Sequence, residues 1–296
     1  MTKLIFGCGY LGARVAERWH EAGEEVAVVT RSDGRAADFS CRGYKAIVAD
    51  VRRAETLRHL PAADTVLFAV GYDRTSSQSI HQVYAGSVQN VLAALPPDAG
   101  RFIYISTTGV YGPAGGEWVD EETPPDPRRD GGRAALAAEQ ILTAHPLGKR
   151  SVILRLAGVF GPGRIPFLNE LRAGEPIPAS STGYLNLIHV DDAAAVVVAA
   201  AARDWGVAPA TEDRPRVYCV SDGRPVERGE YYREVARQIG APAPTFVAPD
   251  PNSPRAARAE ADRRIRNSRM LNEIGVTLAY PDYRAGLAAI LETRNQ

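Results

Sequence analysis

The stretch Lys3-Leu4-Ile5-Phe6-Gly7-Cys8-Gly9-Tyr10-Leu11-Gly12 decides the fold prediction for this chain. An apolar strand ends there in a GxGxxG loop, and the residues from Tyr10 to Ala22 continue as a predicted helix. Gly7 permits a tight turn, Gly9 lets the backbone approach a phosphate, and Gly12 lets the helix pack close to the strand. Helix N-termini attract anions. An ordinary glycine-rich turn is the alternative, but the order strand, loop, helix favours a dinucleotide pyrophosphate site that includes Tyr10 and Leu11.

Strand and helix signals alternate through the first half of the chain. Strands are predicted at residues 26–30, 44–49, 65–70, 102–106 and 152–156, helices at 80–95 and 133–144, and loops at 121–132 and 208–216. This alternation predicts an α/β fold with a doubly wound parallel sheet of the Rossmann type. In such sheets, ligands bind beyond the carboxyl ends of the strands.

Composition excludes several classes of protein. The 296 residues carry 35 basic and 35 acidic side chains, so bulk charge gives no reason to expect nucleic-acid binding. The longest small-apolar run, residues 193–202, is too short to span a membrane and predicts a buried helix. Cys8, Cys41 and Cys219 lack metal-like spacing, so no metal site is predicted. Free cysteines and a first strand at residue 3, with no signal peptide before it, suit a reducing cytoplasm.

The end of the second predicted strand bears on the choice of cofactor. Enzymes that prefer NAD usually carry Asp or Glu there, which bonds the ribose 2′-hydroxyl. This chain has Thr30-Arg31-Ser32 instead. Arg31, with Ser32 and Arg35, can bind a 2′-phosphate through charge-assisted hydrogen bonds. NADP is therefore the predicted cofactor, with NAD as the alternative, unless Arg31 is only a solvated surface charge.

Two further strand ends are predicted to contact the dinucleotide. Asp50 and Val51 follow the third strand and are placed to meet the adenine edge. Ala69 and Val70 end the fourth strand, where the cofactor would cross the sheet. For Asp50 the alternative is a helix N-cap before Arg53.

Later segments together resemble one known family. Residues 105–112 read I-S-T-T-G-V-Y-G, residues 155–163 read R-L-A-G-V-F-G-P-G, and residues 186–192 read N-L-I-H-V-D-D. They are similar to the SSxxVYG, RxxNVYGPG and NFIHVDD segments of extended short-chain dehydrogenases/reductases. The chain is identified as an atypical member of that superfamily, in the NAD(P)-dependent epimerase/dehydratase group. Its first loop is GxGxxG, whereas the group usually has TGxxGxxG.

The resemblance implies a domain organisation and partners. Residues 1–160 would form the dinucleotide-binding domain, and residues 161–296 a smaller, interrupted substrate-side region. A segment of about 187–220 would return to the main sheet. The family also suggests a homodimer through the helices at 80–95 and 133–144. The implied substrate is a hydroxylated small molecule, with a sugar as one candidate.

The chain departs from the family at its catalytic Tyr-x-x-x-Lys pair. Alignment on residues 137–139 places Gly131 at the Tyr position and Ala135 at the Lys position, and neither side chain can transfer a proton. If the chain is an enzyme, Tyr111 or a residue of the 121–132 loop would have to replace the tyrosine. Tyr111 could instead be a packing aromatic.

A group of hydroxyls and one arginine complete the predicted site. Thr107 takes the family's Ser/Thr position, which polarises the substrate oxygen, and lies between Ser106 and Thr108. Hydroxyl clusters at strand ends can also serve only turns and caps. Arg164 could bind a substrate anion or be a solvated loop charge. Two hypotheses remain: an NADP-dependent oxidoreductase or epimerase-like enzyme, and a catalytically silent NADP-binding sensor or assembly module.

Overall fold

The computed structural model describes residues 1–73, 75, 77–205, 214–250 and 262–292, which form two compact units. The first unit contains residues 1–110, 127–155 and 194–218. The second contains residues 111–126, 156–193 and 219–296, as far as these are described. Most of the predicted loop at 208–216 lies outside the described residues.

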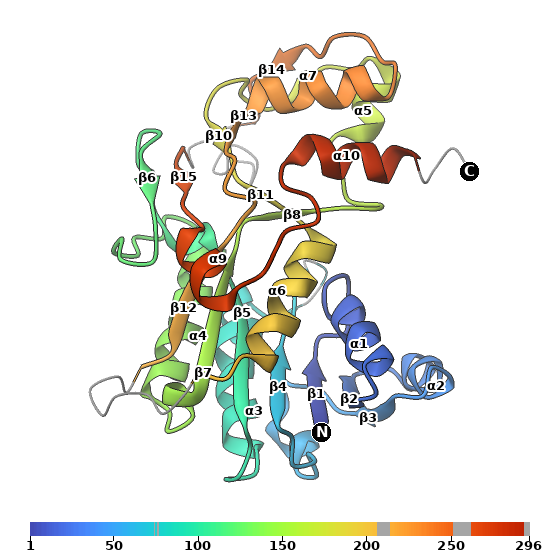
Figure 1. Cartoon of the computed structure of the whole chain (residues 1–296), viewed down its shortest axis with the longest axis vertical. Helices are drawn as coiled ribbons and strands as arrows, with labels where there is room; N and C mark the ends of the chain where they lie inside the picture. Colours follow the sequence, from blue (N-terminus) through green and yellow to red (C-terminus); the bar gives the residue numbers. More distant parts are fainter. Residues whose placement is uncertain (74, 76, 206–213, 251–261, 293–296) are drawn as a thin grey trace. The chain divides into compact units, whose positions relative to one another are not determined.

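A seven-stranded sheet organises the first unit (Figure 1). Its strand order is β12-β7-β5-β4-β1-β2-β3, and β1 pairs in parallel with both β2 and β4. This order confirms the predicted doubly wound parallel sheet. The strands are β1 Thr2–Phe6, β2 Glu25–Thr30, β3 Lys45–Val48, β4 Thr65–Phe68, β5 Arg101–Thr107, β7 Ser151–Leu156 and β12 Arg216–Val220.

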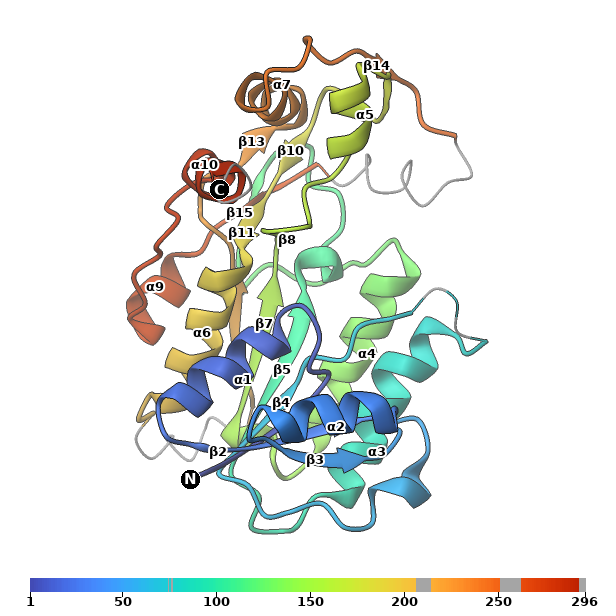
Figure 2. The same ribbon diagram turned by 90° about the vertical axis from the view of Figure 1, so that its right-hand side faces the viewer.

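Helices cover both faces of this sheet, as the side view in Figure 2 shows. On β1, Leu4 and Phe6 point to one face, where they join a core with side chains of α3 and α4. Ile5 points to the other face, where α1 packs so closely that a Cβ on Gly12 would lie 3.5 Å from it. The helical elements that contribute to the first unit are α1 Gly12–Glu21, α2 Asp33–Cys41, η1 Ala54–Leu57, η2 Gln82–Gly86, α3 Ser87–Ala94, η3 Thr108–Val110, α4 Asp130–Ala144, η4 Gly148–Arg150 and most of α6 Val190–Ala202.

Two predicted helices differ from the observed ones in detail. The helix predicted at 80–95 is observed as a π-helical turn, Gln82–Gly86, followed by α3. A π turn accommodates one extra residue per turn, which hydrophobic periodicity does not reveal. The helix α4 begins at Asp130 rather than at residue 133, because Arg129 is the last residue with an extended backbone. The run at 193–202 lies in α6, where Val196 and Val197 are fully buried.

The second unit is built from short paired strands and helices. Its core includes Phe160, Leu171, Tyr231 and Leu287. The strand pairs are β6 Trp118–Val119 with β15 Arg264–Ile265, β8 Gly158–Phe160 with β11 Leu187–His189, β9 Ile177–Pro178 with β14 Phe246–Val247, and β10 Tyr184–Leu185 with β13 Val226–Glu227. Its helices are α5 Leu168–Ala173, α7 Arg228–Gln238, α9 Ser268–Ile274, α10 Tyr283–Glu292 and the start of α6. Across the described residues of both units, no helix is long and apolar enough to span a membrane.

Candidate dinucleotide-binding site

The glycine loop begins where the carboxyl ends of β1 and β4 meet. Crossovers leave β1 and β4 in opposite directions along the sheet, so this is the topological switch point at which nucleotides bind in such folds. Gly7 has a φ of 90°, and a Cβ there would lie 2.5 Å from the Ala69 carbonyl and 2.7 Å from the Val70 nitrogen. Glycine is therefore required at this position by the backbone of β4. The contact places Ala69 and Val70 beside the loop, and their predicted contact with a dinucleotide stays a prediction.

The other two glycines differ in what surrounds them. A Cβ on Gly12 would lie 2.3 Å from the Gly7 carbonyl oxygen, so the first turn of α1 packs directly on the loop. A Cβ on Gly9 would meet no atom of the described residues within 4 Å. Gly9 is exposed and lacks a positive φ, so the protein's own atoms do not demand glycine there. The space in front of Gly9 is therefore open.

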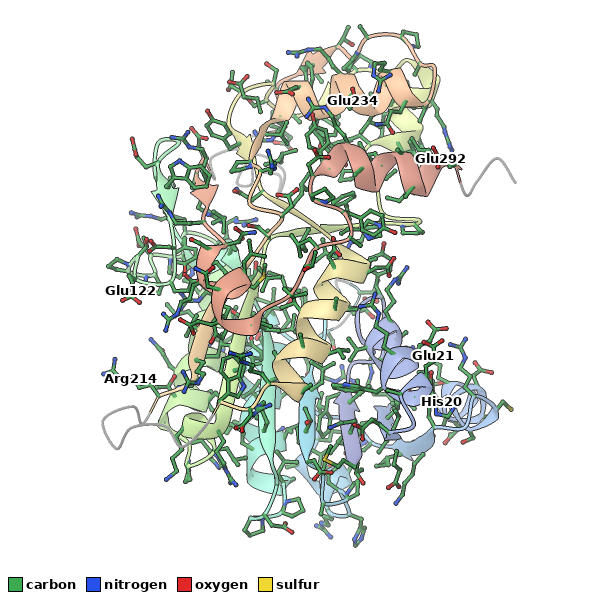
Figure 3. The ribbon with its side chains drawn as sticks, in the orientation of Figure 1. His20, Glu21, Glu122, Arg214, Glu234 and Glu292 are labelled. Carbon is green, nitrogen blue, oxygen red and sulfur yellow. The ribbon has the colours of Figure 1, made fainter. Side chains whose placement is uncertain are left out.

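The N-terminus of α1 is prepared for an anion. Leu11 precedes the helix without a capping side-chain hydrogen bond, and the first turn holds no acidic residue. The first N–H groups of a helix have no partners within the helix and carry partial positive charge. Arg14 donates to the Tyr10 carbonyl oxygen at 2.8 Å, which adds a full positive charge beside the loop. Glu21, labelled with His20 in Figure 3, belongs to the last turn of the helix and so lies away from the loop.

Cationic and hydroxyl groups gather at the end of β2. Arg35 Nη2 donates to the Cys8 carbonyl oxygen at 2.7 Å and so ties α2 to the glycine loop. The Ser32 hydroxyl accepts from the Arg35 N–H at 3.3 Å, which leaves its own hydrogen free to donate. Arg31 is exposed and makes no hydrogen bond to any described residue. The Cys8 thiol is buried, and burial raises its pKa to about 11, so it is unreactive in the closed loop.

Asp50 is engaged by an arginine two residues away. Arg52 Nε donates to Asp50 Oδ1 at 2.8 Å, and this hydrogen bond lowers the pKa of the carboxyl group. Asp50 does not cap the following 3₁₀ helix, which starts after Arg53 without a side-chain cap. Val51 is buried, and its carbonyl oxygen accepts from Asn90 Nδ2 at 3.0 Å.

The hydroxyls at the end of β5 have different partners. Thr107 Oγ1 accepts from the Gly109 N–H at 3.0 Å, so its hydrogen remains available to a ligand. Ser106 Oγ donates to Glu139 of α4 at 2.5 Å, and Arg155 pairs with the same carboxylate at 2.7 Å. These three side chains are buried, so Ser106 is bound to an internal network. Thr108 is buried as well.

The positions aligned with the family's Tyr and Lys lie on α4. A Cβ on Gly131 would lie 3.4 Å from Ile80 Cδ1, and Ala135 is 1% exposed. The chain has three lysines, Lys3, Lys45 and Lys149, and none of them follows a tyrosine by four residues.

The sequence analysis missed one arginine at the start of α4. A Cβ on Gly109 would lie 3.2 Å from Thr107 Oγ1 and 3.4 Å from Arg129 Nη2. Arg129 follows Thr107 by more than 20 residues, within a stretch expected to be a loop, and no sequence pattern connects them. The only hint in the sequence was that the stretch contains two arginines, Arg128 and Arg129.

Two predicted site residues belong to the second unit. The Tyr111 hydroxyl lies 3.2 Å from Cys219 Sγ, and Tyr111 is 2% exposed. Arg164 is exposed in a tight turn in which its N–H donates to the Gly161 carbonyl oxygen at 2.9 Å.

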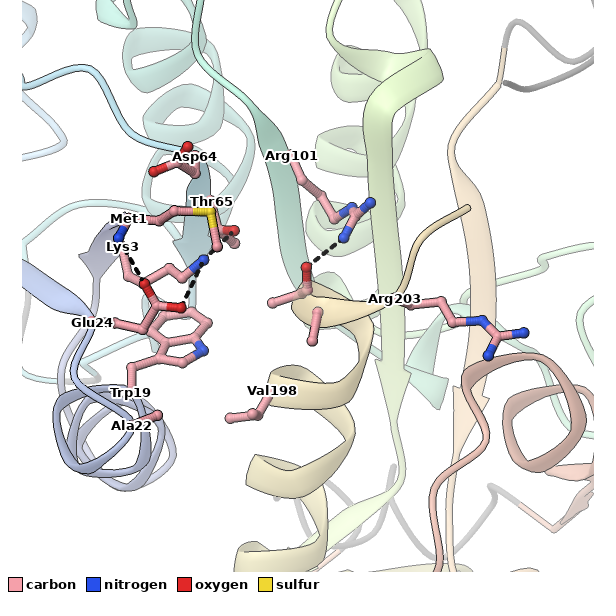
Figure 4. Close-up of a pocket in the computed structure, with 12 residues that line it drawn as sticks. Met1, Lys3, Trp19, Ala22, Glu24, Asp64, Thr65, Arg101, Val198 and Arg203 are labelled. Carbon is pink, nitrogen blue, oxygen red and sulfur yellow. Dashed lines mark hydrogen bonds and ion pairs between the residues drawn. The ribbon is translucent and has the colours of Figure 1, made fainter. Parts of the chain in front are cut away.

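A cavity of about 470 Å³ lies at the other edge of the sheet, beside the amino ends of β1, β4 and β5 (Figure 4). Its polar groups already have partners: Lys3 Nζ lies 3.8 Å from a Glu24 carboxylate oxygen, and Arg101 donates to the Ala200 carbonyl oxygen at 3.0 Å. Ligands of parallel sheets bind at the opposite edge. No group of three or more His, Cys, Asp or Glu side chains in the described parts of the chain could hold a metal ion.

The fold and the loop geometry define a Rossmann-type protein with a glycine loop at the switch point of its sheet. The chain belongs to the NAD dependent epimerase/dehydratase family, whose sequence model matches residues 4–211. This confirms the resemblance inferred from the sequence.

Individual relatives are similar to this chain over nearly its whole length. The chain is 30% identical to Protein YeeZ of Escherichia coli (strain K12), over 94% of this chain and 96% of the relative. It is 25% identical to a 3-diazoavenalumate denitrifying reductase of a Streptomyces species, over 97% and 99% of the two chains. A solved structure described as a putative NAD-dependent epimerase/dehydratase from Methylobacillus flagellatus is 29% identical, with a TM-score of 0.78 and coverage of 100% and 99%.

Proposed function

We propose that this chain is an NADP-dependent oxidoreductase that acts on a small molecule with a hydroxyl or carbonyl group. The observation that carries the proposal is Arg31, which occupies the end of β2 where an NAD-preferring enzyme has a carboxylate. It makes no hydrogen bond within the described chain, and Ser32 and Arg35 lie next to it in the sequence. Arg31 interacts electrostatically with the carboxylates of Asp50 and Asp73, and a 2′-phosphate would form charge-assisted hydrogen bonds with its guanidinium.

Different residues of the first unit would bind different parts of the cofactor. The loop Gly7–Gly12 and the N-terminus of α1 would hold the pyrophosphate, and Arg31 with Ser32 would hold the 2′-phosphate. Asp50 and Val51 would border the adenine, and Ala69 and Val70 would line the crossing of the sheet. When bound, NADPH supplies a hydride to a substrate carbonyl carbon.

Thr107 would orient the reacting oxygen at the end of β5. Its hydroxyl hydrogen is available, whereas the Ser106 hydroxyl already donates to Glu139. A donor aimed at the oxygen stabilises the charge that develops there. The Streptomyces relative is named as a reductase, which supports hydride transfer as the reaction class.

Calorimetric titration with NADP and NAD tests the cofactor assignment. We expect the unmodified protein to bind NADP more tightly, and Arg31→Asp to bind NADP about 10 to 100 times more weakly, because one or two charge-assisted hydrogen bonds are replaced by repulsion. Arg150→Asp is the matched control, since Arg150 is exposed and precedes the amino end of β7. Equal affinity of the unmodified protein for both dinucleotides would refute the role of Arg31.

The second hypothesis is a catalytically silent NADP sensor or assembly module, favoured by Gly131 and Ala135 at the family's catalytic positions. We expect no turnover of generic sugar nucleotides or simple alcohols. The sensor hypothesis would be supported if the protein binds NADP and no compound in a broad metabolite screen changes the absorbance of NADPH.

Location and assembly follow from the same proposal. We expect a cytoplasmic protein, because a nicotinamide cofactor and free cysteines suit that compartment. A homodimer through the segments 80–95 and 133–144 stays a prediction, although none of the exposed large hydrophobic side chains identified in the described chain lies on these segments. Light scattering gives the oligomeric state directly, and a monomer at high concentration would exclude the dimer.

A further inference from the structure

Thr107 and Arg129 border the same space beside Gly109 in the first unit. The point at which a Gly109 Cβ would sit is 3.2 Å from the Thr107 hydroxyl oxygen and 3.4 Å from Arg129 Nη2. Both contacts are tight, so a side chain at this position would push the hydroxyl or the guanidinium aside. The Thr107 hydroxyl oxygen and Arg129 Nη2 therefore lie close enough to each other for one small ligand to contact both.

The backbone fixes this arrangement. A Cβ on Gly132 would lie 2.2 Å from the Gly109 carbonyl oxygen and 2.9 Å from Pro127 Cβ, so the first turn of α4 packs directly on the end of β5. Arg129 immediately precedes that turn, and its carbonyl oxygen accepts from the Arg133 N–H at 2.9 Å. The backbone of Arg129 is thus held in place by the first turn of α4, which packs on the end of β5.

The Arg129 side chain has no partner of its own. It is half-buried, and its guanidinium forms no hydrogen bond or ion pair with any residue that the structure describes. Burial lowers its pKa, and no carboxylate opposes that effect. A cation that is partly withdrawn from water and has no counter-ion is favoured by a ligand that supplies the opposite charge. The neighbouring Arg128, by contrast, is exposed.

We propose that Thr107 and Arg129 form a subsite for an oxo acid or the matching hydroxy acid. The Thr107 hydroxyl donates to the reacting oxygen, and the Arg129 guanidinium binds the substrate carboxylate, for which its planar fork is suited. This inference rests on the proposed function and narrows its substrate class. It also assigns a role to a residue of the stretch that precedes the missing Tyr position.

The test is calorimetric titration of the protein loaded with oxidised NADP, in which a carbonyl compound can bind but cannot be reduced. The probes are pyruvate and acetoacetate, with acetone as the neutral ketone. We expect the unmodified protein to bind at least one of the two acids and not acetone. Arg129→Met should weaken that binding about tenfold or more, because a charge-assisted pair is lost. The affinity of Arg129→Lys for the acids should lie between that of the unmodified protein and that of Arg129→Met, since lysine keeps the charge and lacks the planar guanidinium fork.

Controls separate this inference from the proposed function and from misfolding. Arg128→Met should bind the acids as the unmodified protein does, and all variants should bind NADP equally. Arg129→Met should also keep or raise the melting temperature, because no internal partner is lost. Failure to bind NADP at all would refute the proposed function. NADP binding without acid binding, or acid binding that survives in Arg129→Met, would refute the subsite alone.

Discussion

At the scale of single residues, Asp222 shows how burial changes the behaviour of a carboxyl group. It is 7% exposed, and its Oδ2 has no hydrogen-bond partner among the described residues. Burial raises its pKa from 3.8 to about 7, and the nearby carboxylates of Asp282 and Asp192 act in the same direction. Asp222 Oδ1 accepts from the Arg224 N–H at 2.9 Å, an interaction that an asparagine can also make.

We expect Asp222→Asn to change the pH dependence of stability. Between about pH 4 and pH 7 the folded protein keeps a proton on Asp222 that the unfolded chain has lost, so the free energy of unfolding contributed by this group falls as pH rises. Above about pH 7 Asp222 is ionised in both the folded and the unfolded protein, so its destabilising contribution no longer changes with pH. The variant lacks this slope and should gain stability relative to the unmodified protein as the pH increases. Urea unfolding at about pH 5 and about pH 8 checks the sign, and an unchanged difference between the two proteins would contradict it.

The sequence predicted the residues that lie along one strand or loop and missed those brought together by packing. Ala69 and Val70 lie against Gly7, because parallel strand ends meet at one edge of the sheet. The approach of Arg129 to Thr107 depends on the contact between Gly109 and Gly132, which neither local pattern contains. Likewise, nothing local distinguishes Ser106 from Thr107, because their difference comes from Glu139 on another element.

At the scale of elements, Gly9 and Gly12 at the junction of β1 and α1 can be compared by the same substitution to alanine. We expect Gly12→Ala to destabilise the protein by about 1–3 kcal/mol, because the new Cβ would lie 2.3 Å from a backbone oxygen and the helix must shift. Gly9→Ala should change stability by no more than about 0.5 kcal/mol, since its Cβ meets open space.

The order of these two variants in NADP affinity should differ from their order in stability. Gly9→Ala should fold normally and still lose most of its affinity for NADP, because the methyl group occupies the space that we assign to a phosphate. Urea unfolding and calorimetric titration of the same samples give both quantities. Normal NADP binding by Gly9→Ala would show that the dinucleotide does not approach this residue.

The boundaries of elements were harder to predict than their existence. All five strands predicted after the first are observed, and four of them are largely buried in the sheet, whereas the edge strand β3 Lys45–Val48 is not. The helix at 80–95 was predicted without its π-helical turn at Gln82–Gly86, and α4 starts three residues earlier than predicted. Polar and small residues such as Asp130 and Gly131 carry no periodicity, so tertiary packing decides where the helix begins.

At the scale of the whole molecule, the two units differ in how far the sequence predicts them. The first unit follows from alternating strands and helices, which restrict the topology to a doubly wound sheet. Strands of two or three residues in the second unit carry no periodic signal, and their partners are distant. Ile177–Pro178, for example, pairs with Phe246–Val247. Three separate segments build the first unit, so its sheet is complete only after most of the chain has been synthesised.

The rate at which the buried thiol of Cys8 is alkylated would report how often the glycine loop opens. Cys41 is exposed and should be alkylated quickly, whereas Cys8 and Cys219 are buried. Because Cys8 is buried and Arg35 binds its carbonyl oxygen, we expect iodoacetamide to reach the thiol when the loop separates from α2. Peptide mass spectrometry would then time this opening, with Cys219 as the internal standard for global unfolding. A dinucleotide that clamps the loop should slow the labelling of Cys8 and leave the rate at Cys41 unchanged.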